Sequence, residues 1–85
     1  MSFRISYAPP ADDTLAKMRD GDFFRDEMAR TLAKDPYGHG SSAVKREHDR
    51  REATVDGAIV LYYVSGSVLT VTVVRLVPFL SSVQE

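Results

Sequence analysis

Residues 45–57, "KREHDRREATVDG", concentrate the side chains best suited to acid, base and phosphate chemistry. Four of them are Lys or Arg, which bind phosphate oxygens through charge-assisted hydrogen bonds. His48 is the best conventional acid or base, because an imidazole with an ordinary pKa near 6.5 takes either role at neutral pH. Its neighbours Glu47 and Asp49 favour the protonated form. The alternative interpretation is a solvated connector whose charges only pair with one another.

The whole-chain composition narrows the classes of function. Net charge is −1 and the pI is about 6.1, whereas dedicated nucleic-acid binders are usually more basic. Any such role must therefore come from a local patch. The absence of cysteine excludes disulfides, thiolate metal sites and cysteine nucleophiles, and two histidines do not support a metal site. We expect one domain over 1–85, no cofactor, no membrane association and a cytoplasmic location.

The first half of the sequence predicts a strand followed by a helix hairpin. "FRISY", residues 3–7, alternates like a half-buried strand, and Pro9 and Pro10 are expected to stop it. Residues 11–22 predict a short helix stopped by Gly21, with an N-cap at Asp12, Asp13 or Thr14. A second helix, capped by Asp22, runs to Asp35-Pro36 and buries the stripe Phe24, Met28 and Leu32.

The second half predicts three strands in a meander, over residues 50–55, 58–64 and 67–77. Asp56-Gly57 and Ser65-Gly66-Ser67 are typical of hairpin turns. The expected fold is therefore α+β in the order β-α-α-β-β-β, with a helix hairpin on one face of a twisted, largely antiparallel four-stranded sheet. Residues 78–85 are expected to form a loose tail with Phe79 and Leu80 tucked in.

The order of these elements, together with several short stretches, resembles the RelE/ParE family of bacterial toxins from toxin-antitoxin pairs. The matching stretches are "LAKDPYGHGS", "SAVK", "DRREATVDGAIVLYYV" and "LTVTVVRLV". The resemblance covers about residues 3–77 and implies a twisted sheet packed on two helices, with a concave basic face. It also implies one of two targets, messenger RNA in the ribosomal A site for RelE-like toxins or DNA gyrase for ParE-like toxins, and an antitoxin that wraps the toxin.

Carried over residue by residue, the resemblance matches the family's basic positions only in part. Its basic pair at the start of the second strand falls at Arg50 and Arg51, and the basic residue before it at Lys45. Other positions that are basic in the family fall on Glu52 or Thr54, on Ile59, and near Pro78 and Phe79. The family's late helix or tail, which often carries a Tyr, has no counterpart before Glu85.

We therefore predict catalytic roles for Arg50, Arg51 and His48, and RNA or phosphate binding by Lys45, Arg46, Arg75 and Tyr62. Arg50 and Arg51 point to opposite faces if both lie in a strand, so only one can reach the exposed surface. Of Tyr62 and Tyr63, one is expected in the core and the other able to stack a base. The plainer alternatives are rim ion pairs for the arginines, including Arg75, and solvation for Lys45 and Arg46.

The function favoured by these residues is that of an mRNA endoribonuclease that depends on the ribosome and is weakened by the missing cations. Its partners would be mRNA on the ribosome and a short, charged, partly helical antitoxin. The alternative is a toxin homologue without nuclease activity, either a gyrase poison or an antitoxin-binding protein. An unrelated small α+β protein stays open as a third interpretation.

Overall fold

The computed structural model describes residues 2–79 of the chain. Residues 80–85, where most of the expected loose tail falls, lie outside this range, and the expected burial of Phe79 is wrong because its side chain is 40% exposed. No helix within residues 2–79 is long and apolar enough to cross a bilayer. The elements are β1 (Arg4–Tyr7), α1 (Pro9–Lys17), α2 (Gly21–Arg30), β2 (Ser42–Val44), β3 (Glu47–Val55), β4 (Ala58–Ser65), the 3₁₀ turn η1 (Gly66–Val68) and β5 (Thr70–Pro78).

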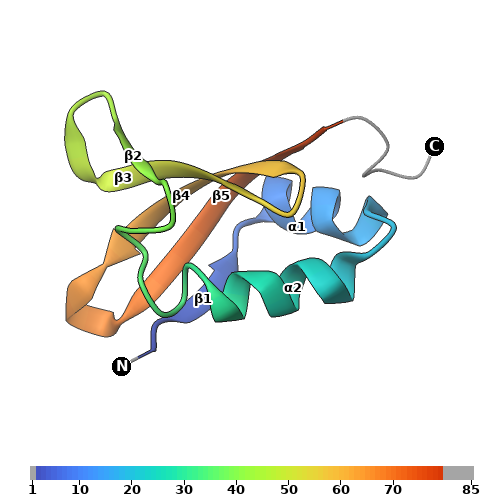
Figure 1. Ribbon diagram of the computed structural model, residues 1–85, viewed down its shortest axis with the longest axis horizontal. Coiled ribbons are helices and arrows are strands. Elements are labelled where there is room, and N and C mark those ends of the chain that lie inside the picture. Colours follow the sequence, from blue (N-terminus) through green and yellow to red (C-terminus); the bar gives the residue numbers. More distant parts are fainter. Residues whose placement is uncertain (1, 80–85) are drawn as a thin grey trace.

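The strands form one mixed sheet in the order β1-β5-β4-β3-β2, and both helices lie on the same side of it (Figure 1). β1 pairs with β5 in parallel, whereas β2 to β5 form an antiparallel meander. The predicted α+β fold is confirmed, but the sheet has five strands rather than four. The missed strand is β2, "SAV", which is too short for its alternation to stand out in the sequence.

Strand alternation puts one face of the sheet against the helices and leaves the other open. On β4, Val60, Tyr62 and Val64 are buried together with the predicted helix stripe of Phe24, Met28 and Leu32. The intervening residues Ile59, Leu61 and Tyr63 lie on the opposite face and are only partly buried. The open face is therefore the surface on which the outward side chains of β3, β4 and β5 meet.

The helix boundaries differ from those predicted because the two prolines begin α1 instead of only ending β1. Their fixed φ suits the first turn, where an N–H has no helical acceptor, and Ala8 occupies the N-cap position. The predicted caps at Asp12, Asp13 or Thr14 are therefore wrong. Gly21 does not stop α1 but is the first residue of α2, so the N-cap position is Asp20 and not the predicted Asp22. The helix α2 ends at Arg30, earlier than the predicted end at Asp35-Pro36.

Candidate functional site

The tip of the β2–β3 hairpin carries two adjacent cations, Lys45 and Arg46. They form the two-residue connection between Val44 and Glu47, and Figure 1 shows the hairpin reaching away from the helices. Both have left-handed backbones, with φ of 54° for Lys45 and 65° for Arg46. This is the geometry of a type I′ hairpin turn, which usually takes Asn-Gly because other side chains are strained there. Lys45 and Arg46 thus form a tight turn that exposes two positive charges.

Arg51 points toward the helix side of the sheet and is only 8% exposed. Its Nε donates to Ser41 Oγ at 3.0 Å and one terminal nitrogen donates to the His48 carbonyl at 3.0 Å. The other terminal nitrogen donates to the carbonyls of Ser41, at 3.2 Å, and Tyr37, at 3.5 Å. The guanidinium therefore ties the loop of residues 37–41 to β3. These bonds and its burial speak against the catalytic role predicted for Arg51, because they hold the guanidinium within the fold.

Arg50 lies on the open face, as the predicted alternation requires. Its terminal nitrogen donates to the hydroxyl of Tyr63, the residue directly opposite it on β4, and its guanidinium carbon lies 4.8 Å from the centre of that ring. Its Nε lies 3.7 Å from Glu47 Oε2 and has no hydrogen-bond partner among residues 2–79. That Nε is buried, so although 34% of its side chain is exposed, Arg50 can reach a ligand only with its terminal nitrogens.

Tyr62 and Tyr63 divide between the two faces, and Tyr62 is the buried one. It is fully buried, and its hydroxyl donates to the Pro36 carbonyl at 2.5 Å. Burial raises the pKa of Tyr62, so its hydroxyl stays protonated. This burial speaks against the predicted contact of Tyr62 with RNA, since its ring is enclosed by the core. Tyr63, beside Arg50, is the tyrosine on the open face.

His48 lies at the exposed start of β3 and stacks on Tyr37, a residue that the sequence did not single out. The ring centres are 4.6 Å apart and the planes differ by 12°. The Tyr37 hydroxyl donates to Asp49 Oδ1 at 2.6 Å, and the Arg51 guanidinium lies 5.2 Å from the Tyr37 ring centre. The hydrogen bond to Asp49, more than any other cause, raises the pKa of Tyr37 above its usual value. No local pattern marks Tyr37, because only the hairpin brings it to His48.

Arg75 is exposed on β5 and does not join the other cations. It pairs across the sheet with Leu61, at a bulge between β4 and β5, and Leu61 in turn faces Glu52 of β3. Within residues 2–79 it makes no ion pair, so the alternative rim ion pair is absent there. Arg75 therefore stands alone on the open face, two strands away from Arg50.

The open face also includes two of the positions at which the family resemblance expects cations, Thr54 and Ile59. Thr54, Ile59 and Val77 lie side by side across β3, β4 and β5. Val77 is 40% exposed and Ile59 is partly buried. This end of the face is therefore apolar, and positive charge on the sheet is concentrated toward the hairpin.

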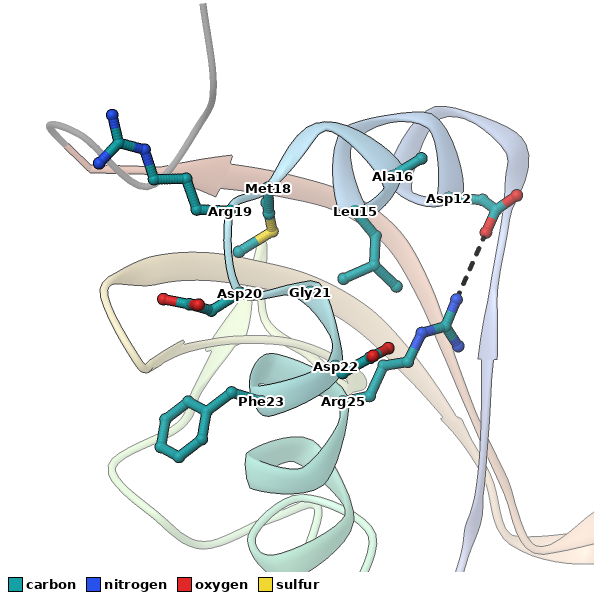
Figure 2. Close-up of a pocket in the computed structure, with 10 residues that line it drawn as sticks. All are labelled: Asp12, Leu15, Ala16, Met18, Arg19, Asp20, Gly21, Asp22, Phe23 and Arg25. Atoms are coloured by element: carbon teal, nitrogen blue, oxygen red, sulfur yellow. Dashed lines mark ion pairs between the residues drawn. The ribbon is translucent and has the colours of Figure 1, made fainter.

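A separate cavity of about 450 Å³ lies at the turn between α1 and α2 (Figure 2). Its lining includes Leu15, Met18 and the exposed Phe23, and Arg25 pairs with Asp12 across one side at 4.0 Å. A Cβ on Gly21 would lie 3.1 Å from the Leu15 carbonyl oxygen, so glycine permits this tight turn. No residue of the charged run lines the cavity, which therefore does not belong to the candidate site.

Comparisons with known proteins show which solved structures share this fold. The chain matches no protein-family model and no curated protein. It is similar to a solved chain of the toxin-antitoxin complex RelBE2 from Mycobacterium tuberculosis, with a TM-score of 0.74 and 20% identity over 92% of this chain and 99% of that one. It is also similar to a chain of the archaeal RelE-RelB complex from Pyrococcus horikoshii OT3, with a TM-score of 0.60 and 15% identity over 92% and 96%. The fold is thus that of a RelE-like toxin.

Proposed function

We propose that this protein is an endoribonuclease that cleaves messenger RNA on the ribosome. The observation that carries the proposal is Arg50, which Tyr63 and Glu47 hold on the open face of a RelE-like sheet, at the base of a hairpin tipped by Lys45 and Arg46. A cation fixed before the substrate arrives needs little reorganisation when negative charge develops in the transition state. Arg50 is therefore the residue on which this proposal rests.

The reaction uses the RNA's own 2′-hydroxyl as nucleophile. Its oxygen attacks the adjacent phosphorus, a P–O2′ bond forms and the P–O5′ bond breaks, leaving a cyclic 2′,3′-phosphate and a free 5′-hydroxyl. The 2′-hydroxyl gives up a proton and the departing 5′-oxygen receives one. The pentavalent phosphate carries extra negative charge, which cationic hydrogen-bond donors stabilise.

The remaining predicted residues divide these tasks. Arg50 donates to the phosphate oxygens in the transition state through its terminal nitrogens, since its side chain is partly exposed on the open face whereas its Nε is buried. His48 supplies one of the two proton transfers, and water exchanges the other proton. Lys45, Arg46 and Arg75 contact flanking phosphates and set the position of the strand.

An antitoxin is the second partner of this proposal. Both matched structures were solved as complexes, one described as toxin-antitoxin and the other as RelE-RelB. A short, charged, partly helical antitoxin would neutralise the exposed cations near the hairpin and cover the apolar end of the open face at Ile59 and Val77. The same surface would then be closed to mRNA.

A second candidate function is a toxin homologue that binds an antitoxin or poisons gyrase without cutting RNA. Two observations favour it. Arg51 is occupied within the fold, and Thr54, Ile59 and Val77 form an uncharged end of the open face. A folded protein that leaves mRNA intact but inhibits gyrase supercoiling, or binds only its antitoxin, would replace the nuclease proposal.

The deciding experiment is primer extension on a defined mRNA in a reconstituted translation reaction, with and without ribosomes. Wild-type protein should produce cuts that need ribosomes, and Arg50→Ala should lower the cleavage rate roughly tenfold or more, because one transition-state donor is lost. Arg50→Lys, which keeps the charge but not the planar fork, should fall between the two. Equal cleavage by all three proteins would reject Arg50 as the catalytic cation.

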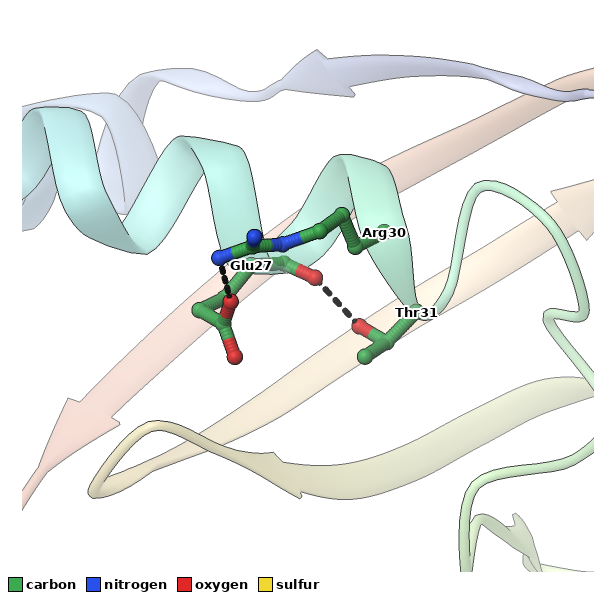
Figure 3. Close-up of polar contacts among 3 residues, drawn as sticks. All are labelled: Glu27, Arg30 and Thr31. Carbon is green, nitrogen blue, oxygen red and sulfur yellow. Dashed lines mark hydrogen bonds and ion pairs between the residues drawn. The ribbon is translucent and has the colours of Figure 1, made fainter.

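Arg30→Ala is the matched control. Arg30 on α2 pairs with Glu27 three residues before it, as Arg50 pairs with Glu47, and Thr31 donates to the Glu27 carbonyl beside it (Figure 3). Both substitutions remove one arginine and one (i, i+3) ion pair, so they change net charge equally. Only the Arg50 substitution should affect cleavage, and a similar loss with Arg30→Ala would point to a general charge effect.

A further inference from the structure

Tyr37 and His48 present a flat aromatic surface, of which only His48 has a role in the proposed cleavage. The two rings are nearly parallel, with centres 4.6 Å apart, and both residues are exposed. Tyr37 comes from the loop before β2 and His48 from the start of β3. The pair therefore depends on the fold of the hairpin and not on neighbouring positions in the sequence.

The Tyr37 ring is held from two directions before any ligand binds. Its hydroxyl donates to Asp49 at 2.6 Å, and the Arg51 guanidinium lies 5.2 Å from the ring centre. Arg51 also donates to the backbone carbonyls of both Tyr37 and His48. A ring fixed in this way loses little conformational entropy on binding a partner.

The surroundings of the pair fit a nucleic acid better than a purely structural contact. Arg51 already ties residues 37–41 to β3 through its own hydrogen bonds, so the loop does not need an exposed aromatic pair to hold it. Lys45 and Arg46 lie on the same hairpin, in a turn whose left-handed backbone exposes both cations. Proteins that bind single-stranded nucleic acids commonly place exposed aromatic rings, on which bases stack, beside cations that bind phosphates.

We propose that Tyr37 and His48 form a stacking platform for one unpaired base of single-stranded RNA, with the phosphates beside that base held by Lys45 and Arg46. This inference rests on the proposed function, since it names the part of the mRNA that the hairpin would hold. The base stacks on the face of the His48 ring that points away from Tyr37. The Tyr37 ring, whose hydroxyl donates to Asp49, supports His48 from the other side.

The test is fluorescence anisotropy of the full chain with a labelled 2′-O-methyl hexaribonucleotide, which cannot be cleaved because its 2′-oxygens are blocked. Tyr37→Leu should weaken binding about tenfold through the loss of one stacking contact. Tyr37→Phe keeps the ring and should bind nearly as well as wild type. The slope of log affinity against log salt should stay unchanged in both variants but become shallower in Lys45→Ala/Arg46→Ala.

A hexamer of abasic sugars separates stacking from a general loosening of the loop. Wild-type protein should bind it about as weakly as Tyr37→Leu binds the normal hexamer, and Tyr37→Leu should lose nothing further on it. Equal losses by Tyr37→Leu on the normal and abasic hexamers, or no binding of the normal hexamer by wild type, would overturn the platform. If binding depends on Tyr37 but mRNA is not cleaved, the stacking proposal stands and the nuclease proposal is rejected. If mRNA is cleaved but binding does not depend on Tyr37, the nuclease proposal stands and the stacking proposal is rejected.

Discussion

The β2–β3 hairpin and the helix hairpin differ in how their arginines are used. Residues 45–51 hold four basic side chains against two acidic ones, whereas residues 12–26 hold three basic against five acidic. At the β-hairpin, Arg50 and Arg51 are each fixed by hydrogen bonds to the protein. At the helices, Arg25 lies over the Tyr7 ring and reaches Asp12 only at 4.0 Å, with half of its side chain exposed.

This difference shows that a net charge of −1 conceals two ends of opposite character. Local fields, not the total charge, steer a charged ligand toward a surface. An anionic strand would approach the β-hairpin and be repelled by the carboxylates around the α1–α2 turn. The cavity beside Phe23 therefore lies at the wrong end of the molecule for phosphate chemistry.

The largest effect on stability is expected from removing the buried arginine. Arg51→Ala leaves the carbonyls of Tyr37, Ser41 and His48 without their donor and should lower the free energy of unfolding by about 3 kcal/mol. Arg25→Ala breaks only an exposed ion pair and a cation–π contact and should cost less than about 1 kcal/mol. Urea unfolding of both variants measures the contrast, and equal losses would remove the structural role assigned to Arg51.

The sequence predicted features that depend on a strong period within one element. Phe24 and Met28 are buried as their helical spacing indicated, and Leu32 is buried too although it lies just beyond the end of α2. Arg50 and Arg51 take opposite faces because strand side chains alternate. The sequence did not show which face of each strand is buried. "AIVLYYV" is apolar at almost every position, so its pattern does not say whether Tyr62 or Tyr63 points inward.

The remaining features depend on contacts between elements. β2 has three residues and its turn is Lys-Arg, so neither strand alternation nor a Gly-containing turn signalled the hairpin. Tyr37 meets His48 only after that hairpin folds back. Missing the hairpin therefore also hid the buried position of Arg51 and the aromatic pair.

The turn at the hairpin tip should show a conflict between stability and binding. Replacing Lys45-Arg46 by Asn-Gly gives the left-handed backbone the residues it favours and should raise the free energy of unfolding by about 1–2 kcal/mol. The same change removes two cations and should weaken RNA binding, most clearly at low salt. Thermal unfolding and anisotropy on the same samples test both parts. A variant that is stabilised yet binds RNA normally would show that the tip does not contact phosphate.

The smallest expected effect is a change in the pKa of one tyrosine, Tyr37 at the β2–β3 hairpin, with Tyr7 beside the helices as the comparison. The pKa of Tyr37 is raised above 10.0 chiefly by its hydrogen bond to Asp49, whereas burial raises that of Tyr7 against the lowering effect of Arg25. A phenol whose pKa is raised by folding stabilises the protein fully below its unfolded pKa and loses that contribution as pH rises through the folded value. Asp49→Asn should therefore lower the pKa of Tyr37 in an NMR titration and leave Tyr7 unchanged. If both tyrosines shifted together, the hydrogen bond from Tyr37 to Asp49 would not be the cause, and the orientation of the Tyr37 ring would need another explanation.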